Sequence, residues 1–232
     1  MTYFRSLGVI VAGGGGGSTE PTFTETLIAD NTSKTDDVYL DSDWSTYDFL
    51  RFELENTNTN TTLSIISIPE IVTAIFTGSS NIVNFNEVGN NQYVCYQKVN
   101  GTRWHKYGAR NLVLTKVYGI NCSNMSVTKT ELYQKSSIAA TLETITLVED
   151  SSDFDYIFAS MCDGSYDETQ LANSVTCMSN VFDKCGDGAR CITNAYNKPP
   201  AIYVINGTSF DVEYTANPNY SYVFNLYGVA FS

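Results

Sequence analysis

Tyr47-Asp48-Phe49-Leu50-Arg51-Phe52-Glu53-Leu54-Glu55 is the stretch that indicates the fold class most clearly. From position 50 onward, its leucine and phenylalanine side chains fall on one face of an extended chain. Its arginine and glutamate side chains fall on the other face. This alternation predicts a strand of an antiparallel sheet, with one face packed on a core and the other in contact with water.

Other segments have the same character. Residues 62–68, 93–99 and 202–205 are rich in β-branched and aromatic side chains, as strands are. Asn100-Gly101 and Asn206-Gly207 follow two of these runs and are typical of tight hairpin turns. One segment predicts a helix instead, because apolar residues recur at helical spacing between Glu168 and Phe182.

A pattern near residue 40 recurs in the second half of the chain. Val38 to Leu50 and Ile145 to Ile157 share a β-branched residue, a leucine two positions later, and then aromatic-Asp-aromatic-aliphatic, at an offset of 107 residues. Residues 113–120 and 222–229 share a hydrophobic-Tyr-Gly-aliphatic ending at an offset of 109. Two matches in nearly the same register predict a tandem duplication.

The duplication predicts the domain organisation. We expect an all-β protein in which a short N-terminal anchor and glycine-rich hinge, residues 1–20, precede two tandem β-sandwich, jelly-roll-like domains. The first domain would span residues 21–125 and the second residues 126–232. Short strands at regular spacing and few helical stretches agree with this architecture.

Composition excludes several classes of function. The chain has 232 residues and a formal net charge of −12, with 13 basic residues and one histidine. Nucleic acids and anionic membrane surfaces are unfavourable partners for such a chain, because both require clustered Lys and Arg. No apolar run approaches the ~18 residues of a membrane span. Hydrophobic residues make up 43%, which argues against wholesale disorder.

The N-terminus combines an apolar segment with a glycine run. Gly13, Gly14, Gly15, Gly16 and Gly17 lack the flanking residues of a phosphate-binding loop, so we read them as a flexible hinge and predict no cofactor. The segment before them is too short for a secretory signal and cannot bury itself, which favours an anchor that inserts into a partner. The anchor residues would be Tyr3, Phe4, Leu7, Val9, Ile10 and Val11. A frayed terminus is the alternative.

The six cysteines leave several interpretations open. None forms a C-x-x-C pair, and four of them lie between Cys162 and Cys191. Free or structural thiols and disulfides in an extracellular particle are both compatible with the spacing, and a metal site is a third, weaker alternative. Carboxylates also cluster at positions 36–48 and 163–168, but both groups fail the EF-hand pattern. We interpret them as solvated turn residues, with another kind of calcium site as the alternative.

The sole histidine, His105, lies in Arg103-Trp104-His105-Lys106-Tyr107. One histidine does not make a multi-histidine metal site, and no G-x-S-x-G motif accompanies it, so no catalytic residue is predicted. Trp104, His105 and Tyr107 are candidates for ligand contact, because aromatic rings offer rigid surfaces for stacking a sugar. A strand end with half-buried aromatic side chains is the alternative.

Residues that recur in both halves are expected to be structural. Asp48 and Asp155 occupy equivalent positions and should cap a turn or accept backbone N–H groups. The Tyr-Gly pairs should mark strand bends or bulges. These pairs are Tyr118 with Gly119 and Tyr227 with Gly228.

A short leader, a glycine run and tandem β-units with aromatic-Asp-aromatic-aliphatic strands resemble bacteriophage virion proteins of the tail-fibre, receptor-binding, head-fibre and capsid-decoration kinds. The resemblance implies a non-enzymatic component of an assembled particle, commonly a trimer, attached to other virion proteins through its N-terminus. It also implies assembly in the host cytoplasm and exposure on the extracellular particle. Two globular units favour a small appendage, collar or decoration protein over a long fibre.

Two functions follow as hypotheses. The first is a virion structural protein whose outer domain stabilises the shell or attaches to a host surface glycan or protein. The second is a free carbohydrate-binding or adhesin module of a bacterial surface. A fibre-borne hydrolase is a third, disfavoured class, because the chain has one histidine and none of the usual catalytic motifs.

Overall fold

The computed structural model describes residues 21–77, 81–87, 92–134, 144–163, 175–183, 189–193, 201–214 and 221–232. The predicted anchor and glycine hinge, residues 1–20, lie outside these ranges. The expectation that they form an anchor therefore stays a prediction.

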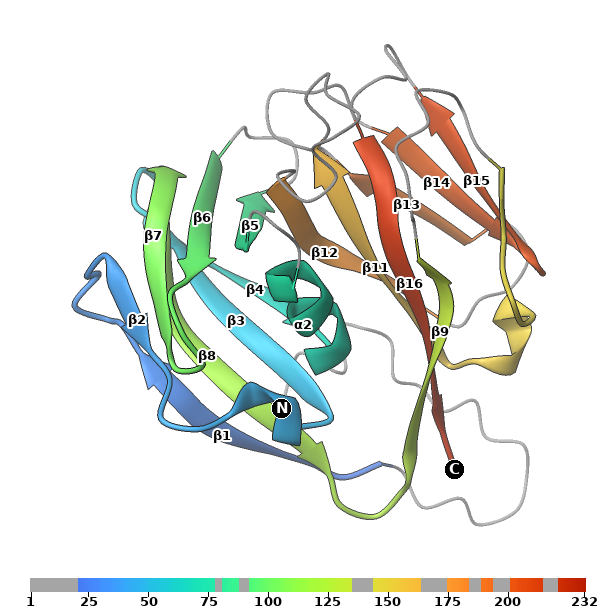
Figure 1. Ribbon diagram of the computed structural model, residues 1–232, viewed down its shortest axis with the longest axis horizontal. Coiled ribbons are helices and arrows are strands. Elements are labelled where there is room, and N and C mark those ends of the chain that lie inside the picture. The colour runs from blue at the N-terminus through green and yellow to red at the C-terminus, as the bar shows by residue number, and fades with distance from the viewer. Residues whose placement is uncertain are drawn as a thin grey trace.

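The described residues form an all-β protein, as the sequence predicts (Figure 1). The strands of the first half are β1 (Phe23–Asp30), β2 (Asp37–Tyr39), β3 (Phe49–Asn56), β4 (Thr61–Ser67), β5 (Ile82–Glu87), β6 (Gln92–Lys98), β7 (Arg103–Arg110) and β8 (Leu112–Cys122). The strands of the second half are β9 (Val127–Gln134), β10 (Thr144–Thr146), β11 (Tyr156–Asp163), β12 (Val175–Asp183), β13 (Ala189–Thr193), β14 (Ala201–Asn206), β15 (Ser209–Tyr214) and β16 (Ser221–Phe231). The described helices are the short 3₁₀ helices η1 (Trp44–Thr46) and η2 (Ser151–Asp153) and the α-helix α2 (Pro69–Thr77).

The strands form three sheets. One sheet has the order β1-β8-β3-β4, a second has the order β10-β15-β14-β13, and an eight-stranded sheet has the order β2-β7-β6-β5-β12-β11-β16-β9. The eight-stranded sheet joins the two halves through the parallel pair β5–β12, in which Val83 is opposite Thr176. The other paired strands within the described ranges are antiparallel.

The two halves repeat one strand order. The order β1-β8-β3-β4 in the first half corresponds to β9-β16-β11-β12 in the second. The order β2-β7-β6-β5 corresponds in the same way to β10-β15-β14-β13. The eight-stranded sheet therefore consists of one four-stranded sheet from each half.

The hydrogen bonds at the turn before β3 recur before β11. Asp48 Oδ2 accepts the backbone N–H of Cys122 at 2.8 Å, and Asp155 Oδ2 accepts that of Phe231 at 2.9 Å. Asp43 and Asp150 each accept a backbone N–H two residues ahead and so cap η1 and η2. Asp48 and Asp155 thus hold the start of one central strand against the end of its neighbour.

The two glycines of the repeated Tyr-Gly pairs lie under aromatic rings. A Cβ added at Gly119 would lie 2.4 Å from the ring of Tyr47, and one added at Gly228 would lie 2.5 Å from the ring of Phe154. The pairing register shifts at both tyrosines. On β1 it shifts between Leu27, which is opposite Tyr118, and Ala29. On β16 it shifts between Leu226 and Tyr227. The expected strand irregularity is therefore present, and the glycines also provide room for a ring.

The core of the first half lies between its two sheets. Leu50, Phe52 and Leu54 on β3 are fully buried, so the predicted apolar face is confirmed. On the outer face, Arg51 is covered as well, because its guanidinium binds Glu25 and lies 3.8 Å from the ring centre of Tyr118. Ion pairing and stacking thus bury an arginine on the face that the pattern assigned to water.

Three predicted strands are confirmed as β4, β6 and β14, and the predicted turns follow the last two. Gly207 has a positive φ of 57° between β14 and β15, which glycine adopts without strain. The predicted helix from Glu168 to Phe182 is wrong, because β12 is a strand over Val175–Asp183. Pairing with β11 and β5 overrides a helical spacing that a buried strand can also show.

The nine-residue helix α2 was not expected. It begins with Pro69 and Glu70, the residue types that favour a first helical turn, and buries Ile71, Val72, Ile75 and Phe76. The corresponding connection of the second half, between β12 and β13, spans only residues 184–188. The first half therefore has the longer connection at this position.

Candidate functional site

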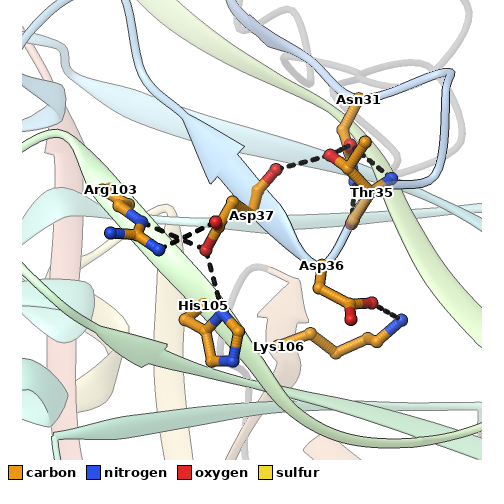
Figure 2. Close-up of polar contacts among 7 residues, drawn as sticks. All are labelled: Asn31, Thr35, Asp36, Asp37, Arg103, His105 and Lys106. Atoms are coloured by element: carbon orange, nitrogen blue, oxygen red, sulfur yellow. Dashed lines mark hydrogen bonds and ion pairs between the residues drawn. The ribbon is translucent and has the colours of Figure 1, made fainter.

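A cluster of charged and polar side chains lies where the short edge strand β2 pairs with β7 (Figure 2). The register places Asp37 opposite His105 and Tyr39 opposite Arg103, while Val38 and Trp104 between them are buried. Side chains directly opposite one another in a sheet share a face. The outward face therefore gathers a carboxylate, an imidazole, a guanidinium and a phenol from segments far apart in the sequence.

Asp37 is the centre of this cluster. Arg103 donates from Nε at 3.1 Å and from Nη2 at 2.8 Å to its two carboxylate oxygens, and His105 Nδ1 lies 2.8 Å from Oδ1. The hydrogen bonds from Arg103 and then His105 hold the pKa of Asp37 below its ordinary value. The hydrogen bonds that Arg103 donates to Asp37 in turn raise the pKa of Arg103. The carboxylate thus orients both basic side chains.

The loop before β2 is held by a buried asparagine. Asn31 is 3% exposed and donates to the carbonyl oxygen of Leu114 at 2.9 Å, which ties the loop to β8. Its Oδ1 accepts the backbone N–H of Thr35 at 3.0 Å, and the Thr35 hydroxyl lies 2.7 Å from the carbonyl oxygen of Asp37. Figure 2 shows this chain of contacts leading from Asn31 to Asp37. The position of the carboxylate is therefore fixed from inside the fold.

The two strands of the cluster also carry exposed tyrosines. Tyr39 is 61% exposed and Tyr107 is 67% exposed, and the Arg103 guanidinium lies 5.9 Å from the ring centre of Tyr39. The imidazole of His105 is about half exposed between these strands. We call Tyr39, Arg103, His105 and Tyr107, with Asp37 beneath them, the β2–β7 face.

The β2–β7 face offers aromatic rings on which the apolar face of a ligand can stack. It also offers polar groups for the ligand's hydroxyl groups. Tyr39 and Tyr107 offer rigid aromatic surfaces. When Nδ1–H of His105 donates to Asp37, Nε2 can accept a hydrogen bond from a hydroxyl group of a ligand. In the protonated ring, Nε2–H donates a hydrogen bond instead. Among the described residues, no hydroxyl or thiol is hydrogen-bonded to that nitrogen.

The structure corrects the prediction for Trp104. Its side chain is fully buried, and its ring centre lies 5.0 Å from that of Phe76 and 5.6 Å from that of Trp44. Trp104 therefore has no surface for a ligand and belongs to the core. The sequence Arg103-Trp104-His105 already indicates this, because successive side chains of a strand point to opposite faces. An exposed imidazole at 105 therefore places the indole of residue 104 on the buried face.

Asp37 and Tyr39 were missed as members of this surface. Asp37 was grouped with the acidic turn residues, and only the pairing of β2 with β7 shows its role. Three other members of that acidic group have separate structural tasks: Asp36 forms an ion pair with Lys106, Asp43 caps η1 and Asp48 accepts a backbone N–H. They do not converge on one point, as calcium ligands must.

The structure also bears on the metal site, the cysteine pairing and the membrane span considered from the sequence. Among the described residues, no group of three or more His, Cys, Asp or Glu side chains has an arrangement that could hold a metal ion. Cys122 is a free thiol, and the buried Cys95 Sγ donates to Asn84 Oδ1 at 3.4 Å. The clustered cysteines between 162 and 191 have side chains outside the described part, so their pairing stays a prediction. None of the helices in the described ranges has the length and apolarity that a bilayer crossing requires.

Comparisons with known proteins add no identity. No protein-family model matches the chain, and no curated protein matches it either.

Proposed function

We propose that this chain is a non-enzymatic structural component of a bacteriophage-type particle. It would be attached through its N-terminal segment and would project a duplicated β-frame outward. The observation that carries the proposal is the repeated strand order of the two halves, joined by β5–β12 into one continuous eight-stranded sheet. A shared sheet couples the halves more firmly than a linker would, because its backbone hydrogen bonds cross from one half to the other. Such a body suits a shell or appendage protein.

Attachment would use the apolar segment before the glycine run. Tyr3, Phe4, Leu7 and residues 9–11 would insert into a partner of the particle, and Gly13 to Gly17 would allow the β-frame to reorient. The partner would be another virion protein. The assembled form would be a homo-oligomer, with a trimer as the expected state.

Co-sedimentation with assembled particles tests the proposal. Particles are assembled with the full chain or with a chain lacking residues 1–17, and bound protein is quantified. The full chain should co-sediment and the truncated chain should not. Equal co-sedimentation of both would overturn the anchor, and failure of the full chain to co-sediment would overturn the particle assignment.

A carbohydrate-binding module is the second candidate function, and the β2–β7 face is the observation that favours it. The exposed Tyr39 and Tyr107 rings beside an oriented His105 fit a sugar with an apolar C–H face and hydroxyl groups. The same face would serve host attachment if the chain belongs to a particle.

A glycan array tests this binding role. The wild type should bind a defined glycan, and Tyr107→Ala should lose that binding while keeping its fold, because the ring is exposed. Tyr156→Phe is the control, because its ring lies on β11 of the second half and is almost fully buried. Binding that survives both Tyr107→Ala and Tyr39→Ala would exclude the β2–β7 face.

A further inference from the structure

A pocket lies at the end of the first half, where Thr102 directly precedes Arg103 and its carbonyl oxygen accepts the backbone N–H of Leu40. It has a volume of about 320 Å³ and lies where η1, α2 and the β6–β7 turn meet. Its lining includes Asp43, Trp44, Ser45, Thr73, Lys98 and Thr102. A volume near the lower end of the range for small-molecule sites suits a ligand of monosaccharide size.

The pocket has one cation that is not engaged in an ion pair. Across the described residues, no carboxylate lies within 4 Å of the Lys98 ammonium, although most other lysines and arginines there have such a partner. The ammonium lies 5.2 Å from the ring centre of Trp44 and 5.9 Å from that of Phe76. Aromatic rings position Lys98 while its hydrogen-bond donors stay available.

A hydrogen-bond acceptor lies near this donor. Asp43 Oδ1 accepts the backbone N–H of Ser45 at 2.9 Å. Hydrogen bonds from the backbone and side chain of Ser45, and the nearby charge of Lys98, lower the pKa of Asp43, so its carboxylate stays ionised beside Lys98. A charged donor and a charged acceptor at one pocket match a hydroxyl group, which accepts one hydrogen bond and donates another. The exposed hydroxyls of Ser45, Thr73 and Thr102 add neutral partners.

Two walls of the pocket come from positions at which the halves differ. Trp44 corresponds in the repeat to Ser151, and α2, which carries Thr73, occupies a connection that is much shorter in the second half. The cap residues Asp43 and Ser45, in contrast, recur as Asp150 and Ser152. The pocket therefore combines repeated cap residues with walls specific to the first half.

We propose that this pocket binds a neutral hexose, with Lys98 donating to a sugar hydroxyl, Asp43 accepting from one, and Trp44 as an apolar wall. The inference is independent of the β2–β7 face and of particle attachment. A neutral ligand is favoured over an acidic one because Asp43 lines the pocket and the chain carries a net charge of −12.

Tryptophan fluorescence tests the proposal directly. The chain has only two tryptophans, and Trp44 lines the pocket with Trp104 5.6 Å behind it. Methyl glucoside, methyl mannoside, methyl galactoside and N-acetylglucosamine are titrated, with glucuronate as the acidic comparison. At least one neutral hexose should change the emission with saturation. The proposal is refuted if none of the four neutral sugars changes the tryptophan emission, or if only glucuronate changes it with saturation.

Variants locate the site. Lys98→Met keeps the stem over Trp44 and should weaken binding about tenfold or more through loss of a charge-assisted hydrogen bond. Lys106→Met is the matched control, because that lysine pairs with Asp36 outside the pocket and its loss should leave affinity unchanged. Thr73→Tyr, at an exposed helix position, should fill the pocket without affecting folding. Equal affinity of Lys98→Met, Thr73→Tyr and the wild type would place the sugar elsewhere and refute the proposal.

Discussion

Replacing Gly119 with alanine should destabilise the protein by overpacking a repeated contact. The Cβ of an alanine at this position would lie 2.4–2.5 Å from the Cγ, Cδ1 and Cδ2 atoms of Tyr47. Carbon atoms pack at about 3.5–4.0 Å, so the ring must move by about 1 Å or leave its place. A displaced ring also gives up the contact of its hydroxyl with Ser42, which is 3.2 Å away.

The expected loss is about 1–3 kcal/mol in the free energy of unfolding, the usual cost of inserting a methyl group into a packed site. Gly228→Ala should lie nearer the upper value. The ring above it, Phe154, is only 5% exposed, whereas Tyr47 is half-buried and has more room to move.

Urea unfolding followed by tryptophan fluorescence measures both losses. Gly101→Ala and Gly108→Ala are the controls. A Cβ at Gly101 meets nothing within 4 Å, and one at Gly108 meets Tyr93 at an ordinary 3.9 Å. Both controls should unfold close to the wild-type midpoint.

A double-mutant cycle isolates the contact between ring and glycine. Tyr47→Ala removes the ring, so Gly119→Ala should cost far less in that background than in the wild type. The reasoning is refuted if Gly119→Ala unfolds at the wild-type midpoint, or if its cost is the same with and without the Tyr47 ring.

The remaining predictions concern hydrogen bonds and pH. The folded-state pKa of Asp37 is depressed, so its carboxylate contributes stability above about pH 4, where the unfolded side chain ionises, and this contribution disappears as the pH falls through the folded pKa. Asp37→Asn should accordingly unfold at lower urea than the wild type at pH 7, with a smaller difference near pH 3; an unchanging difference would contradict this. Burial raises the pKa of Tyr96 to about 12, so its contribution is present below pH ~10 and is lost as the pH rises toward 12. Absorbance titration should show a late-ionising tyrosine that is absent in Tyr96→Phe, a variant that also costs about 1–3 kcal/mol by leaving the buried N–H of Leu114 unpaired. Asp48→Ala should cost about 1–2 kcal/mol in urea unfolding because the backbone N–H of Cys122 loses its acceptor, while Asp48→Asn, which keeps an amide oxygen, should cost less.

Local patterns predicted much of the frame. The alternation from Leu50 to Leu54 predicted which side chains are buried, since strand period two assigns alternate residues to opposite faces. The recurrence of Asp48 and Asp155 predicted a backbone-binding role in both halves. These features depend on neighbours in the chain, and residue type and spacing are sufficient for them.

The candidate sites depended on contacts between distant segments. Asp37 and His105 are 68 positions apart, and nothing near either residue shows that β2 pairs with β7. The pocket similarly needs η1, α2 and the β6–β7 turn to meet, and α2 itself was missed because it follows directly after a strand.

The amino-acid sequence by itself determined the all-β class, the register of the repeated pattern and the residues that hold the central strands. Only the tertiary structure decided that Trp104 is enclosed while His105 is exposed, that β12 is a strand, and that β5–β12 joins the halves. The physical reason is that alternation and side-chain type act over a few neighbouring residues. Strand pairing and enclosure, in contrast, are settled by the backbone hydrogen bonds and apolar contacts that segments far apart in the chain make with one another.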